Sequence, residues 1–268
     1  VIPKALLNDL IMTVVKEGAS DLHLTEGRPP VIRVSGFLVP LVKMSMLSRE
    51  DIQGLLSILL TPEGRREFEE KCETNFAYSH TNKERFRSNA FMTLGKASIA
   101  MRLVPTQAKS FEELNLPSIL GVFAKKQQGF FLVVGPAGQG KSTTLATMIE
   151  AINKERLEHI ITIEDPIEYV FEHEKSIISQ REVGSDTNSF ARALRSSLRE
   201  DPNVVLVGEM RDLETIEAAL TIAETGHLVY TTLHTNSAAQ TADRIVDVFP
   251  PHQQQQVRMQ LANVLLGV

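Results

Sequence analysis

The sequence predicts an α/β protein with two parts: a smaller α+β domain, and a larger domain built on a mostly parallel sheet. Three observations lead to this prediction. The chain has 268 residues, and at about 150 residues per domain this suggests about two domains. Beyond Pro117, apolar strand-like runs alternate with amphipathic helical segments. A glycine-rich loop at 135–142 stands between one such strand and the helix that follows.

Composition restricts the class of protein. Hydrophobic residues make up 43% of the chain and charged residues 23%, which argues against disorder. The single cysteine, Cys72, excludes an intrachain disulfide and fits a reducing compartment. A net charge of −5 gives little support for binding to nucleic acid. From this charge we expect no nucleic-acid partner. No apolar run approaches the roughly 18–20 residues of a membrane-spanning helix, so we also expect no membrane-spanning segment.

Residues 1–106 are predicted to form the smaller domain. A stripe of leucine, isoleucine and valine over 4–17 indicates a helix, and residues 21–24 alternate polar and apolar as a strand does. Thr61 and Pro62 have the pattern of an N-cap followed by proline at the first helical position. The other expected elements are a helix opened by Ser48 and strands at 31–34, 37–42, 75–80, 86–93 and 97–104.

Residues 107–117 are predicted to be a linker, polar and bracketed by prolines, with a possible capping box from Ser110 to Glu113. The larger domain then covers 118–268. Its expected strands are 130–134, 160–163, 204–207 and 228–232, and its expected helices are 141–153, 190–199 and 213–224. A last helix carries the stripe Val257, Leu261, Val264 and Leu265. This alternation predicts a mostly parallel sheet covered by helices.

The glycine-rich loop fits the phosphate-binding pattern G-x-x-x-x-G-K-[ST]. It consists of Gly135, Pro136, Ala137, Gly138, Gln139, Gly140, Lys141 and Ser142. Glycines let backbone N–H groups close around phosphate oxygens, and the N-terminus of the next helix adds a favourable dipole. We expect Lys141 to reach the β and γ phosphates of a nucleotide and Ser142 to hold Mg²⁺. The alternative is a tight glycine turn with an exposed lysine.

Two acidic segments follow expected strands. Glu209 comes just after the strand at 204–207, where a phosphate loop needs a carboxylate for metal or water. Asp165 and Glu168 come after the strand at 160–163, where crowded carboxylates suit a hydrolytic centre. We expect catalytic roles for Glu209 and Glu168, whereas a contact of Asp165 with the site is the less favoured interpretation. The alternative is a polar loop with a helix cap, and Asp212 is expected to be only an N-cap.

Several histidines and arginines are further candidates for the phosphate-binding or catalytic site. His227 and His234 bracket the expected strand at 228–232, and a neutral imidazole can donate to a γ-phosphate, although each ring taken singly fits a structural role. On the smaller domain, Arg87 and Arg102 lie on expected strands, and Arg85 directly precedes the expected strand at 86–93. They fit either a solvated sheet face or a contribution to phosphoryl transfer. The helix at 190–199 carries three more arginines, which fit a solvated stripe or a subunit contact: Arg192, Arg195 and Arg199.

Five segments occur in a fixed order along the chain. They are Ala19-Ser20-Asp21-Leu22-His23-Leu24, 135–143, 163–168, 208–212 and 226–235. Together they resemble the type IV pilus retraction ATPases, the PilT-like branch of the secretion ATPase superfamily. The resemblance covers nearly the whole chain, and the combination of segments is specific, whereas the phosphate loop alone is not.

The resemblance implies a PAS-like N-terminal domain, a RecA-like ATPase domain and a homohexamer. It implies that ATP phosphates and Mg²⁺ are held by Lys141, Ser142 and Thr143, with Glu209 positioning the metal or its water. It implies Glu168 as general base, and it matches His227 and His234 to a histidine motif. It also implies that Arg87 and Arg102 reach nucleotide.

The resemblance further implies a cytoplasmic motor, peripherally associated with the inner face of the cytoplasmic membrane, that acts on an inner-membrane pilus platform protein. Residues 180–187 and 218–228 look like those of retraction ATPases. The alternatives are a pilus-assembly or type II secretion ATPase of the same superfamily, or a nucleotide-binding regulator without processive work. A nucleic-acid motor is opposed by the acidic charge balance.

Two features depart from the family pattern. Ala137 and Gln139 stand where the family usually has threonine and serine; these positions offer mainly backbone to phosphate, so we expect binding to survive. The chain begins at Val1 rather than methionine and ends at Gly267 and Val268, inside an expected helix. We therefore expect a fragment whose second domain continues.

Overall fold

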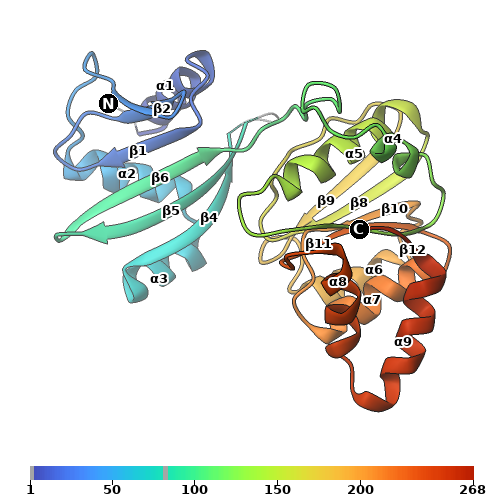
Figure 1. Ribbon diagram of the computed structural model, residues 1–268. Helices are drawn as coiled ribbons and strands as arrows, with labels where there is room; N and C mark the ends of the chain where they lie inside the picture. Colours follow the sequence, from blue (N-terminus) through green and yellow to red (C-terminus); the bar gives the residue numbers. More distant parts are fainter. Residues whose placement is uncertain (1–2, 81–83) are drawn as a thin grey trace. The chain divides into compact units, whose positions relative to one another are not determined.

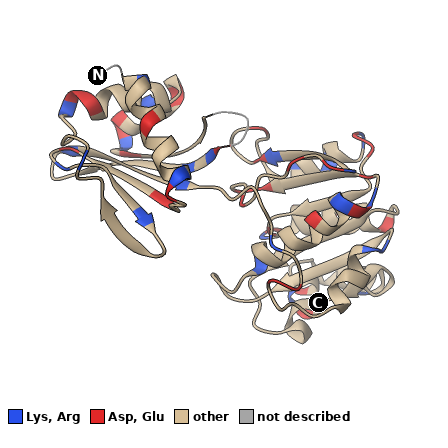
Figure 2. Cartoon of the chain, turned by 90° about the horizontal axis from the view of Figure 1, so that it is seen from above, with Lys and Arg blue, Asp and Glu red and all other residues tan. Residues whose placement is uncertain are grey.

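The computed structural model describes residues 3–80 and 84–268. The chain divides into two compact units, residues 1–104 and 105–268, each with one six-stranded sheet (Figure 1). Acidic and basic residues are interspersed over the elements of both units (Figure 2). Among the residues that the structure describes, no helix combines the length and the apolar composition needed to cross a membrane.

The first unit has an antiparallel sheet in the order β3-β2-β1-β6-β5-β4. Its elements are α1 (Pro3–Lys16), β1 (Asp21–Thr25), β2 (Val31–Val34), β3 (Phe37–Pro40), α2 (Arg49–Leu59), α3 (Pro62–Lys71), β4 (Glu73–Ser79), β5 (Arg85–Thr93) and β6 (Lys96–Leu103). The expected helices and strands of this unit are therefore present. Ser48 and Asp51 form a capping box at the start of α2, and Thr61 caps α3.

Successive side chains along each strand of the first sheet point to opposite faces, so the sheet has a buried face and a second face. Leu22 and Leu24 of β1 are fully buried in a core with apolar residues of α1 and α2. Asp21, between Ser20 and Leu22, stands on the other face. It lies opposite Arg33 of β2 on one side and Arg102 of β6 on the other.

The second unit has a sheet in the order β12-β7-β11-β10-β8-β9, in which every strand pair is parallel. Its elements are α4 (Ile119–Ala124), β7 (Gly129–Val134), α5 (Lys141–Glu155), β8 (His159–Glu164), β9 (Ile177–Glu182), α6 (Phe190–Ser197), β10 (Val204–Val207), α7 (Leu213–Glu224), β11 (Leu228–Leu233), α8 (Ala238–Asp247), α9 (Pro251–Val264) and β12 (Leu265–Gly267). The predicted parallel sheet with covering helices is confirmed.

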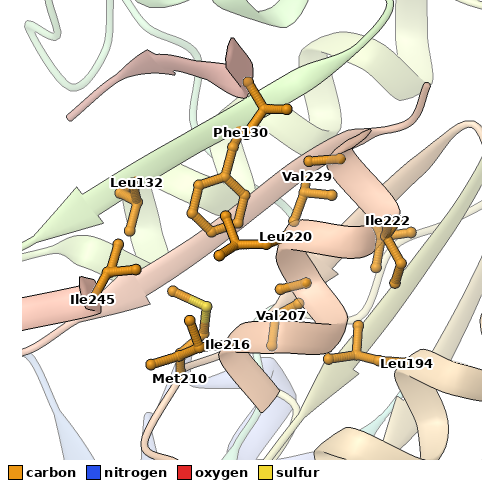
Figure 3. Packing of buried hydrophobic residues seen from close by; sticks show 14 of the residues in the cluster. Phe130, Leu132, Leu194, Val207, Met210, Ile216, Leu220, Ile222, Val229 and Ile245 are labelled. Carbon is orange, nitrogen blue, oxygen red and sulfur yellow. The ribbon is translucent and has the colours of Figure 1, made fainter. Parts of the chain in front are cut away.

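Two apolar clusters cover the two faces of this sheet. Phe130 and Leu132 of β7 belong to the cluster that includes residues of α7 and α9, and Figure 3 shows Phe130 beside Leu220 of α7. Phe131, which lies between them in sequence, belongs to the other cluster, with residues of α5. A strand that is buried on both faces reads as a continuous apolar run, which explains why these strands are recognisable in the sequence.

Several elements of the second unit were missed or misplaced. The elements that were not predicted are α4, β9, α8 and β12. Leu265 was expected in the last helix, and the chain was expected to end inside that helix; both expectations are wrong, because α9 ends at Val264 and Leu265 begins β12, which pairs with β7. At Gly129 of β7, a Cβ atom would lie 2.6 Å from Leu266, so the glycine makes this pairing possible.

The segment at 107–117 contains no helix or strand and lies against the second unit. The backbone N–H of Ser110 donates to Glu113, and the N–H of Glu113 donates to the Ser110 hydroxyl, so the expected capping-box bonds are present in a turn. Thr147 of α5 donates its hydroxyl to the carbonyl of Lys109 at 2.8 Å, and Phe111 packs against the apolar cluster beside α5.

Candidate active site

The carboxyl ends of β7, β8, β10 and β11 meet at one edge of the parallel sheet, where ligand sites of such sheets usually lie. The segments that follow these strands line a pocket of about 250 Å³. Its lining residues are Ala137, Gly138, Lys141, Ser142, Leu145, Ala146, Glu164, Asp165, Pro166, Glu168, Tyr169, Phe171, Leu206, Gly208, Glu209, Thr232 and His234. Seven of the site residues predicted from the sequence line this pocket: Ala137, Gly138, Lys141, Ser142, Glu168, Glu209 and His234.

The phosphate loop connects β7 to α5. Gly138 and Gly140 have φ angles of 77° and 85°, which favour glycine. Because Gly140 has no side chain with which to cap α5, the N–H groups of the first helical turn are left for an anion. Gln139 is exposed and does not line the pocket, whereas Ala137 does.

Lys141 is the first residue of α5 and only 9% exposed. Its Nζ donates hydrogen bonds to the carbonyl oxygens of Gly135 and Pro136 at 2.8 and 2.9 Å. It also lies 3.5 Å from Nδ1 of His234. The ammonium group is therefore held by its own loop, at the wall of the pocket.

Glu209 follows β10, and its side chain is 13% exposed. One carboxylate oxygen lies 3.3 Å from Nε2 of His234, and the other pairs with the guanidinium of Arg211. Lys141, His234 and Glu209 therefore form a chain of polar contacts across the pocket, with His234 in the middle. The role of Asp212 as an N-cap is confirmed, since its carboxylate accepts the N–H of Thr215 at the start of α7.

The end of β8 carries a buried carboxyl to which the sequence assigned no role of its own. Glu164, the last residue of β8, is 5% exposed, and burial raises its pKa to about 7, partly offset by a hydrogen bond from Thr162. Its two oxygens accept the Thr162 hydroxyl at 2.7 Å and the N–H of Glu168 at 3.1 Å. Glu168 itself lines the pocket, as does the exposed Asp165.

The start of α5 holds the predicted hydroxyl residues. Ser142 is exposed at the pocket, and Thr143 accepts a hydrogen bond from the Tyr169 hydroxyl at 3.3 Å. Tyr169 lines the pocket too and was not singled out from the sequence. The sequence could have indicated Tyr169 as a pocket residue through its position directly after Glu168.

His227 is not brought to this pocket. It precedes β11, whereas His234 follows the same strand, so at about 3.3 Å per residue the two rings are separated by about 20 Å of strand. Nδ1 of His227 lies 3.0 Å from the carbonyl oxygen of Ile222 and 3.1 Å from the Thr225 hydroxyl. These contacts fit the structural role that the sequence left open.

Arg87 and Arg102 belong to the first unit, where they lie directly opposite each other on β5 and β6. Nε of Arg102 donates to Asp21 at 2.7 Å, while two-thirds of the Arg102 side chain is exposed. On the second unit, Arg195 pairs with Glu214, and Arg199 lies beyond the end of α6.

Comparison with known proteins identifies the family. A family model described as type II/IV secretion system protein matches residues 1–266. The chain belongs to this family. It is 47% identical over 262 residues to the type IV pilus retraction ATPase PilT of Pseudomonas aeruginosa, which covers 98% of this chain and 76% of that protein. It is also 48% identical over 239 residues to a twitching motility protein of Neisseria gonorrhoeae, covering 89% of this chain and 64% of that protein.

A solved structure has the same fold. The crystal structure of the pilus retraction motor PilT with bound ADP matches with a TM-score of 0.87 and 49% identity, over 96% of this chain and 75% of that chain. The chain is therefore a PilT-like secretion ATPase with an α/β fold, which confirms the resemblance seen in the sequence.

Proposed function

We propose that this chain is a subunit of a homohexameric, Mg²⁺-dependent ATPase that drives type IV pilus retraction. The observation that carries the proposal is the pocket in which Lys141, Glu168, Glu209 and His234 meet. The similarity to PilT supports retraction, with pilin disassembly and twitching motility as its outcome. We also propose that residues 1–106 form a PAS-like domain, 107–117 a linker and 118–268 a RecA-like domain.

The loop at 135–140 and the first turn of α5 would hold the phosphates of ATP. Backbone N–H groups supply the donors, and Lys141 would exchange the carbonyls of Gly135 and Pro136 for phosphate oxygens. The side chains of Ala137 and Gln139 have no part in these bonds, so their departure from the family pattern leaves phosphate binding intact.

The donors at the pocket fit Mg²⁺, which prefers oxygen ligands and keeps several waters. The candidate ligands are the Ser142 hydroxyl and the Glu209 carboxylate. Within residues 3–80 and 84–268, no three His, Cys, Asp or Glu side chains gather into a metal site of their own, so phosphate and water would complete the coordination. When bound, Mg²⁺ neutralises charge on the phosphate oxygens.

In hydrolysis, Glu168 would take a proton from the water that attacks the γ-phosphorus, while the bond from phosphorus to the bridging oxygen of ADP breaks. His234 lies between Glu209 and Lys141 and would hold both in place. Arg87 and Arg102 would stabilise the charge on the transferred phosphoryl group in the assembled ring. The proposed machinery omits His227, because its ring lies at the opposite edge of the sheet.

The ATPase part of the proposal is tested by turnover of the purified protein. Lys141→Ala and Glu209→Gln are each expected to abolish Mg²⁺-dependent ATP hydrolysis. Lys154→Ala is the matched control, because Lys154 lies on the same helix, pairs with Glu150 and is half-exposed away from the pocket. Normal turnover in either pocket variant would contradict the mechanism.

The retraction part is tested in a bacterium that lacks its own retraction ATPase. The native full-length protein is expected to restore twitching. In this proposal it acts on an inner-membrane platform protein, which it contacts from the cytoplasmic side. Its Lys141→Ala variant is expected to leave cells non-motile and with more surface pili. Failure of the wild-type protein to restore twitching would instead point to an assembly ATPase, and tight ATP binding without hydrolysis or oligomers would point to a regulator.

A further inference from the structure

The segment at 165–171, which carries Glu168, forms no helix or strand, although it lies between two strands of the sheet. An irregular backbone at a partly buried site needs hydrogen-bond partners from elsewhere. Here the partners are side chains at the carboxyl ends of β8 and β9.

Gln180 of β9 holds this segment at two points. Its Nε2 donates to the carbonyl oxygen of Tyr169 at 2.7 Å, and its Oε1 accepts the N–H of Phe171 at 2.8 Å. A primary amide has one donor end and one acceptor end, so the two bonds fix both the position and the direction of the segment.

Two buried carboxyl groups hold the same segment nearer Glu168. Glu164 and Glu182 lie opposite each other on the paired strands β8 and β9, and each is 5% exposed. Glu182 accepts the N–H of Ile167 at 2.9 Å, and Glu164 accepts the N–H of Glu168 at 3.1 Å. Three side chains therefore hold four backbone groups of the segment.

We propose that Gln180 and Glu182 are positioning residues for Glu168 in ATP hydrolysis, an inference that rests on the proposed function. They act through the backbone of residues 167–171 and direct the Glu168 carboxylate into the pocket. This gives a role to two residues of the segment at 180–187, which the sequence singled out only for its resemblance to retraction ATPases. A misplacement of about 1 Å in such a group can lower turnover about 100-fold.

The same strand supplies a matched control. Arg181 stands between the two positioning residues, so its side chain points to the other face of β9, where it pairs with Glu200 at 3.0 Å. Arg181→Ala removes a long side chain and an ion pair from β9 but leaves the hydrogen bonds to the segment intact.

The test compares variants of the full-length protein. Gln180→Ala and Glu182→Ala are expected to lower kcat about 10- to 100-fold with the KM for ATP nearly unchanged, whereas Arg181→Ala keeps kcat within about twofold. Glu182→Gln keeps an acceptor oxygen for Ile167 and is expected to recover most of the activity. Hydrogen exchange at residues 167–171 should speed up in the two alanine variants, and unchanged exchange would overturn the inference.

A double-mutant comparison separates positioning from general damage. In a Glu168→Gln background, measured by single-turnover hydrolysis, adding Gln180→Ala is expected to cost little more, because the group that Gln180 positions has already lost its function. An equal loss in both backgrounds would overturn the inference. Full turnover by Glu168→Gln alone would refute the role proposed for Glu168, which is a separate failure.

Discussion

Replacing Glu164 by glutamine is expected to change how the stability of the second unit depends on pH. Burial raises the pKa of the Glu164 carboxyl from 4.5 to about 7, and the nearby Glu168 carboxylate adds to the effect. Between these two pH values the folded chain keeps a proton that the unfolded chain has released. The free energy of unfolding therefore falls as pH rises, and the loss is complete above the folded pKa.

The magnitude follows from the two pKa values. At about 1.4 kcal/mol per pKa unit, a rise from 4.5 to about 7 corresponds to a loss of about 3 kcal/mol, most of which falls between pH 5 and pH 8. Glutamine has no proton to lose. Its carbonyl can accept the N–H of Glu168, and its amide can donate to the Thr162 hydroxyl, so the local bonds are kept.

Hydrogen exchange of peptides from β8 and β9, compared between Glu164→Gln and wild type at each pH, measures this difference because intrinsic exchange rates cancel. The stability of the variant relative to wild type should rise by roughly 2–3 kcal/mol from pH 5 to pH 8. Glu155→Gln, at an exposed position on α5, should show no such trend. A constant difference between Glu164→Gln and wild type across this range would refute the reasoning.

Three other perturbations follow from the structure. Phe130→Ala should destabilise the second unit by about 3–5 kcal/mol in urea unfolding, because Phe130 is fully buried; a loss below about 1 kcal/mol would contradict the packing. Hydrogen bonds from the Ser20 hydroxyl and then the Arg102 guanidinium hold the pKa of Asp21 below its usual value despite burial. Asp21→Asn should therefore destabilise the first unit at pH 7, and the difference from wild type should disappear as acid protonates Asp21. Calorimetry at pH 7 and in acid would test this, and a pH-independent difference would count against the ion pair. Arg211→Gln should lower the Mg²⁺ concentration needed for half-maximal ATP hydrolysis, because Arg211 competes for the Glu209 carboxylate; an unchanged Mg²⁺ titration would argue against this competition.

Central strands were predictable because burial on both faces leaves a continuous apolar run. The four residues of β10 are all buried, and its bounds match those expected from the sequence. The edge strand β9 was missed because Ser179, Gln180 and Arg181 interrupt its apolar pattern. Those polar side chains meet partners on segments remote in sequence, and no local pattern encodes such partners.

The site residues that could be predicted are those that come soon after the end of a strand. Lys141, Glu168, Glu209 and His234 come after different parallel strands, and parallel pairing brings those ends to one edge. Glu164 was missed, because its importance lies in burial and in the amide that it accepts, which depend on the packing around it.

To bind phosphate, the Lys141 ammonium group must replace its hydrogen bonds to loop carbonyl oxygens with hydrogen bonds to phosphate oxygens. The ammonium group already has two carbonyl oxygens as acceptors, so its net contribution to affinity is the difference between those bonds and the bonds to phosphate. Both acceptors are backbone atoms, so side-chain changes in the loop alter this difference little. For this exchange of hydrogen bonds, the loop conformation that Gly138 and Gly140 permit would therefore matter more than the side chains at Ala137 and Gln139.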